Sequence, residues 1–305
     1  MLRFAIKRLL GAIPTLFIII TFSFFLMRIA PGGPFDKERV VPPEIEARLI
    51  HAYHLDEPLP MQFLRYLGDL VRGDFGPSLK YKDFSVTELI WTGFPVSLSL
   101  GGASVLIALL FGLVMGTWAA LRQNSHVDYL VMGTAMIGIM VPNFVLAPLL
   151  TLIFGLTLSW LPVGGWGGPM YMILPIIALS LYQIGFIARL TRGSMIEVLR
   201  TNYVRTARAK GLPERVAITR HALKAGILPV VSYLGPAIIN TITGSVVIEQ
   251  IFGIPGIGRY FVQAALNRDY TLVMGVTVFY GVLIILANLL VDLCYGLLDP
   301  RIRYD

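Results

Sequence analysis

A basic segment at residues 189–224 is the part of this sequence whose residue types are best suited to a chemical role. It carries nine Lys and Arg residues and two acids, Glu197 and Glu214, within a chain that is otherwise largely apolar. Guanidinium and ammonium groups bind carboxylates and phosphates, and in an exposed loop they can hold a soluble partner. The segment therefore indicates a docking surface, although a basic loop that only orients a membrane protein has the same composition.

The order of residues within this segment predicts two short helices that meet at a tight corner. Ser194 and Glu197 are spaced as a capping box, so a helix is expected to begin at Ser194. Gly211 is placed to end that helix, and Pro213 to begin the next helical turn. Four apolar residues are expected to share one helix face: Met195, Val198, Leu199 and Tyr203. The small, basic run that a partner could approach closely consists of Thr206, Ala207, Arg208, Ala209, Lys210, Gly211 and Leu212.

Patterns for covalent or metal chemistry are missing from the sequence. No G-x-x-x-x-G-K-[ST] phosphate loop occurs, so the chain is not expected to hydrolyse ATP. The single cysteine, Cys294, lies in an apolar run and excludes a disulfide within the chain. The apolar runs hold no His/Glu metal pair, no paired Asp and no Ser–His couple, which argues against an intramembrane enzyme. We therefore expect a non-catalytic chain that binds no cofactor or metal itself.

Two further sets of residues could contact a solute or a partner. Polar residues within the apolar runs are candidates for a translocation path: Asn143, Gln183, Asn240, Asn288 and Asp292. The stretch 249–270 is rich in Gly and Pro, and irregular backbone near a membrane must be buried in protein or line water. We interpret it as an outer gate or docking site, the alternative being a plain external loop. Its candidate residues are Glu249, Pro255, Gly256, Gly258, Arg268 and Asp269.

Charged residues inside apolar runs are costly and therefore need an explanation. Arg28 and Glu249 fall at the outer ends of their runs, where they could pair or reach the interface. Asp292 could pair with Arg189 or line a path. Asp128 begins an apolar run, where it is expected to cap a helix N-terminus.

The elements that must position these residues are membrane-spanning helices. Hydrophobic residues make up 56% of the chain and charged residues 14%, whereas soluble domains carry about a quarter charged residues. The apolar runs are long enough to cross a bilayer. We predict an all-α polytopic membrane protein with six spans, near residues 9–29, 94–121, 129–157, 170–190, 225–251 and 271–298. Its net charge of +7 comes from Lys and Arg residues that lie between these runs. Orientation signals of membrane proteins lie at the same places, so the charge does not indicate nucleic-acid binding.

Six spans place both termini on one side of the membrane. The short basic loops share that side, which the positive-inside rule assigns to the cytoplasm. The chain is then divided into 1–30, a tail with the first span; 31–93, an outer loop; and 94–305, a five-helix core with the docking loop at 189–224. Helical apolar spacing at 43–53 and 60–72 predicts that the outer loop forms an ordered cap, the alternative being helices that lie on the lipid surface.

Motifs along the chain resemble those of the permease subunits of ABC importers, in their dipeptide, oligopeptide and nickel branch. Ala207, Gly211 and Leu223 match the cytoplasmic loop signature of that family. Four positions of the signature differ in this chain: Arg205, Thr206, His221 and Lys224. The other similar segments are 28–34, 205–212, 220–223, 249–258, 268–270 and 299–304, and 73–78 with 80–83 is similar to oligopeptide permeases.

This resemblance implies a type I ABC importer permease fold with an ordered periplasmic cap, in a bacterial inner membrane. The expected partners are a homologous second permease subunit, two ABC ATPase subunits that hold ATP and Mg, a periplasmic peptide-binding protein, membrane lipid and the peptide itself. Oligopeptides are the expected cargo, with dipeptides, murein peptides, haem or nickel as alternatives. An ion-coupled secondary transporter is the alternative from another class. It requires midplane acids or broken helices, for which the sequence offers only Asp292.

Overall fold

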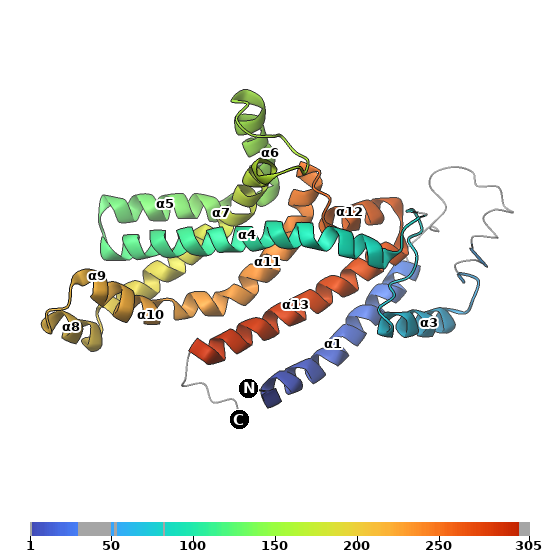
Figure 1. Ribbon diagram of the computed structural model, residues 1–305, viewed down its shortest axis with the longest axis horizontal. Coiled ribbons are helices and arrows are strands. Elements are labelled where there is room, and N and C mark those ends of the chain that lie inside the picture. Colours follow the sequence, from blue (N-terminus) through green and yellow to red (C-terminus); the bar gives the residue numbers. More distant parts are fainter. Residues whose placement is uncertain (1, 30–49, 52–53, 82, 299–305) are drawn as a thin grey trace. The chain divides into compact units, whose positions relative to one another are not determined.

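The computed structural model describes residues 2–29, 50–51, 54–81 and 83–298, and within these ranges the chain is almost entirely helical (Figure 1). An isolated β-bridge joins Pro77 and Ser85. The helices are α1 (Leu2–Ile29), α3 (Leu59–Val71), α4 (Val86–Leu121), α5 (His126–Met140), α6 (Asn143–Leu150), η1 (Thr151–Thr157), α7 (Pro169–Leu199), α8 (Asn202–Ala209), α9 (Glu214–Val216), η2 (Ala217–Ala222), α10 (Leu223–Gly226), α11 (Leu228–Phe252), α12 (Ile257–Asn267) and α13 (Tyr270–Leu298).

Five of the helices in the described ranges are long and apolar enough to cross a membrane, and a bent pair can supply a sixth span. These five are Ile6–Ile29, Val86–Leu121, Pro169–Leu199, Leu228–Phe252 and Tyr270–Leu293. The all-helical, polytopic prediction is thereby confirmed. The expected helix at 43–53 lies largely outside the described residues.

The third expected span, 129–157, is not one straight helix. The pair His126–Met140 and Asn143–Thr157 is bent by 104°. Val141 has an extended backbone, with φ −86° and ψ 116°. Pro142 explains this conformation, because a proline has no N–H for the helix and disfavours a helical residue before it. As a result, Asn143 stands at the start of a new helix.

The chain folds into two compact units. One unit comprises Leu98–Ile254 and, of the described residues, 287–298, and we call it the loop unit because it contains the basic segment. The other unit comprises Leu2–Ser97 and Pro255–Leu286, and we call it the cap unit because it contains α3.

Helix α7 is the central element of the loop unit, where it contacts α5, α6, α10 and α11 (Figure 1). Glycines on its neighbours allow this close packing. A methyl group added at Gly138 of α5 would lie 2.8 Å from the Leu181 carbonyl oxygen, and one at Gly112 would lie 2.7 Å from Cβ of Ile187. Small residues at such crossings are typical of membrane helices, which associate through close packing rather than the hydrophobic effect.

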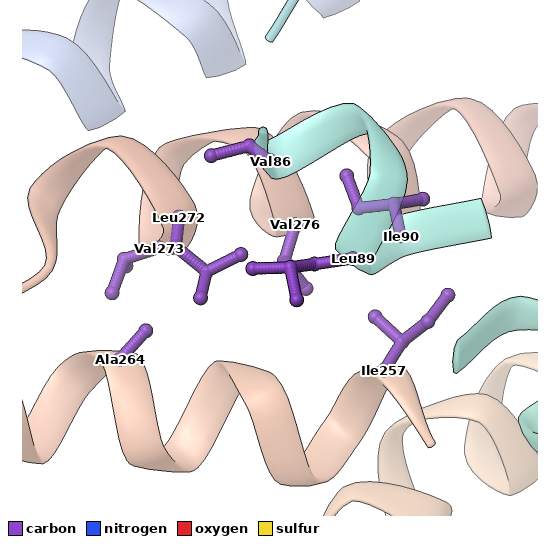
Figure 2. Close-up of a cluster of buried hydrophobic side chains, with 8 residues drawn as sticks. All are labelled: Val86, Leu89, Ile90, Ile257, Ala264, Leu272, Val273 and Val276. Carbon is purple, nitrogen blue, oxygen red and sulfur yellow. The ribbon is translucent and has the colours of Figure 1, made fainter. Parts of the chain in front are cut away.

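The cap unit has a hydrophobic core that is formed by the first turns of α4 and α13 and by α12. Figure 2 shows its buried side chains: Val86, Leu89, Ile90, Ile257, Ala264, Leu272, Val273 and Val276. Helix α3 packs on α1 through aromatic rings, with the centroids of Phe24 and Phe63 5.2 Å apart. The outer-loop helix α3 is therefore packed against the protein.

Candidate functional site

The first short helix of the basic segment begins later than the sequence predicts, because α7 continues through Ser194 to Leu199. The expectation of a helix start at Ser194 is therefore wrong. Met195 is completely buried and belongs to the packed interior, so uninterrupted helix is favoured there over the local capping pattern. The next helix, α8, begins at Asn202 instead. Tyr203 was expected to share one helix face with Met195, but it lies on α8 and is 46% exposed, whereas Met195 lies on α7 and is buried.

Gly211 ends α8 in a Schellman motif, as the sequence predicts. Its N–H donates to the carbonyl of Arg208 at 2.9 Å, and the N–H of Leu212 donates to the carbonyl of Ala207 at 3.3 Å. The φ angle of Gly211 is +77°, a left-handed conformation that glycine adopts without strain. Pro213 was predicted to be the first residue of the next helix, but it is the N-cap of α9, which begins at Glu214.

An ion pair braces this corner from outside. The Arg208 guanidinium donates to both carboxylate oxygens of Glu214, with Nε–Oε2 at 3.0 Å and an amino nitrogen–Oε1 distance of 2.5 Å. This hydrogen bond lowers the pKa of Glu214 below its ordinary value, and it raises the pKa of Arg208. The corner between α8 and α9 is thus held by backbone geometry and by a bidentate side-chain contact.

A small hydrophobic core fixes the corner to the bundle. Its members come from α4, α7, α8, η2 and α10: Ala120, Met195, Val204 and Ala222 are buried, with Ile196, Val198, Leu199, Ile218 and Leu223 packed around them. Ala207 is also buried, so it supports the predicted contact surface and does not form part of it. Six of the seven predicted residues are exposed: Thr206, Arg208, Ala209, Lys210, Gly211 and Leu212. We call these six residues the corner surface.

Asp128 joins α5 to α7 within the first turn of the basic segment, at Arg192. The Arg192 guanidinium donates to its two carboxylate oxygens at 2.5 and 2.7 Å, and the Asn124 N–H donates to it at 2.9 Å. The residue that caps α5 is Ser125, whose hydroxyl accepts from the Asp128 N–H. The expectation that Asp128 caps the helix is therefore wrong. Sequence reasoning missed this pair because its members lie 64 residues apart.

Three of the five translocation-path candidates meet in one pocket of the loop unit. Asn143, Gln183 and Asn240 line a pocket of about 330 Å³ together with Leu179, Tyr182, Thr243 and Gly244, and we call it the amide pocket. The described residues place Asn288 and Asp292 on α13, and neither lines this pocket. The i, i+3, i+4 spacing of its residues on α7 and α11 is a signal that could have identified Tyr182 and Thr243.

The amide pocket is rigid at its base. Gln183 is only 3% exposed; it donates to the Ala237 carbonyl at 3.3 Å and accepts from the Tyr233 hydroxyl at 2.7 Å. The Tyr233 ring stacks on Phe186, with centroids 4.1 Å apart. These contacts hold α7 against α11 and leave the pocket open on the side of Asn240 and Thr243, which are exposed.

The six candidates for an outer gate are divided between the two units. Glu249 lies in the loop unit and is buried, while Pro255, Gly256, Gly258, Arg268 and Asp269 lie in the cap unit. Gly256 and Gly258 are buried, whereas Pro255 and Arg268 are partly exposed. The turn at 256–257 packs on α4, where the Ser97 hydroxyl accepts from the Ile257 N–H at 2.9 Å. The docking role of these residues stays a prediction.

Asp269 links two segments of the cap unit through hydrogen bonds to its carboxylate. Its buried carboxylate accepts from the Ser78 hydroxyl at 2.5 Å and from the N–H groups of Leu79 and Lys80 at 3.2 and 3.3 Å. It also accepts from the Leu272 N–H at 3.1 Å, in the first turn of α13. Asp269 therefore joins the outer-loop segment 78–80 to α13, and its side chain is not available to a docked protein in this conformation.

The candidate membrane spans indicate a polytopic membrane protein, and the family comparison gives its class as a component of a membrane transport system. Residues 112–304 match the family described as "Binding-protein-dependent transport system inner membrane component", and residues 1–101 match its N-terminal companion. The chain belongs to this family, which confirms the resemblance found in its motifs.

Relatives match the chain from end to end. It is 57% identical over 306 residues to the oligopeptide transport system permease protein OppB of Salmonella typhimurium and to that of Escherichia coli, with all of both chains covered. It is 46% identical to the dipeptide transport system permease protein DppB of Bacillus subtilis, covering 99% of this chain and 98% of the relative.

Solved structures share the fold at low sequence identity. An inward-facing MetNI methionine ABC transporter matches with a TM-score of 0.57 at 17% identity, covering 69% of this chain and 96% of the other. An amino acid ABC transporter matches with a TM-score of 0.51 at 19% identity, covering 68% and 94%. The ABC importer permease fold predicted from the resemblance is therefore confirmed.

Proposed function

We propose that this chain is one of two membrane subunits of an ATP-driven oligopeptide importer. The observation that carries the proposal is the corner surface: an exposed, basic, rigidly braced turn on a membrane bundle. A loop needed only for orientation would not require a Schellman corner, a bidentate ion pair and a hydrophobic core beneath it. Such a structure suits mechanical contact with a soluble partner. The similarity to oligopeptide permeases along the whole chain supports peptides as the cargo.

The partners follow from what the chain itself lacks. The sequence has no phosphate loop, so two ABC ATPase subunits would hold ATP and Mg, one of them bound at the corner surface of this chain and the other at the second permease. A homologous second permease would complete the translocation path. A periplasmic binding protein would deliver the peptide, in agreement with the family to which the chain belongs. This chain would itself bind no nucleotide, metal or cofactor and would catalyse no covalent step.

Motion at the corner surface has a direct structural route to the amide pocket. The core beneath the corner includes Met195 of α7, and Asp128 joins α7 to α5 three residues earlier, at Arg192. Tyr182 and Gln183 of the pocket lie on the same helix. Helices are stiff over such lengths, so rigid-body movement of the corner would be passed to the pocket and would switch its access between two states.

A dipeptide importer is the second candidate, favoured by the 46% identity to a dipeptide permease. The alternative from another class is an ion-coupled transporter, and the helix break at Pro142 is a feature that it requires. However, the residue at that break is Asn143, and the lining residues of the amide pocket include no carboxylate for a coupling ion.

Both termini and the corner surface would face the cytoplasm of a bacterial inner membrane.

Transport by the purified complex tests the proposal. The chain would be reconstituted in liposomes with its second permease, ATPases and binding protein, and supplied with labelled di-, tri- and pentapeptides. ATP-dependent uptake of tripeptides and pentapeptides supports an oligopeptide importer. Uptake of dipeptides alone would favour the second candidate, and uptake driven by a proton gradient without ATP would favour the ion-coupled class.

A further inference from the structure

The hydrogen-bonding side chains of the amide pocket are all neutral. They are the carboxamides of Asn143, Gln183 and Asn240, the hydroxyl of Thr243 and the phenol of Tyr182. A carboxamide carries the same donor and acceptor groups as a peptide bond. Metal ions prefer carboxylate, imidazole or thiolate ligands, none of which occurs among the lining residues that the structure describes. The chemistry of the pocket therefore suits an uncharged amide-bearing ligand.

The hydrogen bond of Tyr233 fixes the orientation of the Gln183 carboxamide at the base of the pocket. The oxygen of Gln183 can only accept, so the Tyr233 hydroxyl donates to it. Asn240 lines the pocket and is exposed. The oxygen of its carboxamide is an acceptor for a ligand N–H on that side.

Thr243 presents a second acceptor on the same side. Its hydroxyl donates to the carbonyl oxygens of its own helix, at Ile239 and Asn240, at 3.0 and 3.2 Å. Its oxygen lone pairs therefore stay available. The Asn143 amide nitrogen lies close to Gly244, where an added methyl group would be only 3.2 Å from it. This amide supplies donors, so the pocket offers both halves of a peptide-bond pairing.

We propose that the amide pocket holds a short stretch of peptide main chain during transport, through hydrogen bonds to its N–H and C=O groups. Its volume of about 330 Å³ is at the lower end for ligand pockets, which suits a segment of a peptide better than a whole one. Since main-chain groups are the same in every peptide, the contact does not depend on the cargo's side chains. The inference rests on the proposed function and assigns the substrate contact within it.

A double comparison tests this contact. Uptake of a tripeptide and of the same tripeptide methylated at its central amide nitrogen is measured for the wild-type complex and for Asn240→Leu. In the wild type, methylation removes a main-chain donor and is expected to lower uptake about five- to tenfold. The substitution removes the acceptor and is expected to lower uptake of the unmodified peptide by a similar factor. The factor by which methylation lowers uptake should then be about five to ten times smaller in the variant than in the wild type.

The loss of uptake on methylation in the wild type is divided by the loss on methylation in the variant. The delivery protein is the same in both complexes, so any preference it has between the two tripeptides cancels from this quotient.

Thr243→Val provides a second variant, with Thr134→Val as its matched control. Thr134 is also exposed, and its hydroxyl also donates to carbonyls of its own helix, but it lies outside the pocket. Thr134→Val should leave uptake unchanged. Assembly and basal ATP hydrolysis of each variant establish that it has folded.

Two results would overturn the inference. In the first, the wild type takes up peptides but Asn240→Leu and Thr243→Val do so equally well. In the second, methylation and substitution lower uptake by independent factors that multiply, so the two groups do not meet. A wild-type complex that takes up no peptide would overturn the proposed function, and the inference with it. These outcomes are distinguishable because only the last concerns the unmodified complex.

Discussion

Gly211 determines the shape of the corner surface through its backbone. At φ +77° it is in the left-handed region, where a side chain with a Cβ is strained and a β-branched one most of all. The space around it is open, since no other atom lies within 4 Å of an added Cβ. A substitution here therefore changes the conformation of the corner without a steric clash in the core.

Replacing Gly211 with valine is expected to leave the chain inserted but to lower the amount of peptide taken up per ATP hydrolysed. The left-handed backbone would cost about 1–3 kcal/mol, enough to unwind the corner that meets the ATPase. The measurement is the ratio of peptide uptake to phosphate release in liposomes. Gly211→Asn is the matched control, because asparagine tolerates this conformation. An unchanged ratio for valine would show that the corner does not couple the two reactions.

The Arg208–Glu214 pair makes the corner sensitive to acid. Its hydrogen bond lowers the folded-state pKa of Glu214 below the ordinary value of 4.5. The pair therefore stabilises the corner fully above that value, and this contribution is lost as the pH falls through the lowered pKa. An NMR titration of labelled Glu214 should give a midpoint below 4.5, and Arg208→Met should raise it. Equal midpoints in the two proteins would exclude the pair as the cause.

At the scale of elements, α7 links the parts of the loop unit. It carries residues of the corner's hydrophobic core, of the Asp128 pair and of the amide pocket. Close packing at Gly138 and Gly112 leaves it little freedom to move independently of α5 and α4. We expect α7 to move together with α5, because the Asp128–Arg192 pair joins them within the first turn of the basic segment.

Breaking that pair should destabilise the protein. Asp128 is 1% exposed, and removing one partner of a fully buried ion pair costs about 3–5 kcal/mol. Because Arg192 stays partly exposed, we expect Asp128→Ala to fall at the lower end of that range. Thermal unfolding of the purified complex measures the loss. In Asp128→Ala/Arg192→Leu no unpaired charge remains, so much of the stability should return. A double variant no more stable than the single one would contradict this explanation.

At the scale of the whole molecule, the arrangement of the chain across the membrane can be tested directly. Lys210 in the corner surface and Val71 at the end of α3 are both exposed, and the orientation rule places them on opposite sides. Single cysteines at these positions, in a chain that also carries Cys294→Ala, would be treated with a membrane-impermeant maleimide in intact spheroplasts. Val71→Cys should react and Lys210→Cys should react only after lysis. The opposite pattern would invert the topology and remove the ATPase from the corner surface.

The sequence by itself determined the helical class, five of the six expected spans and the position of the corner. A span depends on the length of an apolar run, and the turn at Gly211 depends on backbone preferences within a few residues. Polar residues inside apolar runs also identified Asn143, Gln183 and Asn240 as candidates. The same local reasoning failed at Ser194, where the burial of Met195 in a tertiary core outweighs a four-residue capping pattern.

Only the tertiary structure decided which of these residues meet. Asn143 reaches the amide pocket because Pro142 ends one helix and the next leaves at 104°, and no local pattern sets that direction. Asp128 finds Arg192 across 64 residues, while Asn288 and Asp292, equally polar, lie on a helix that does not reach the pocket. Local backbone preferences act within a few residues, whereas a pocket depends on how distant helices pack, and one sequence pattern is compatible with many such packings.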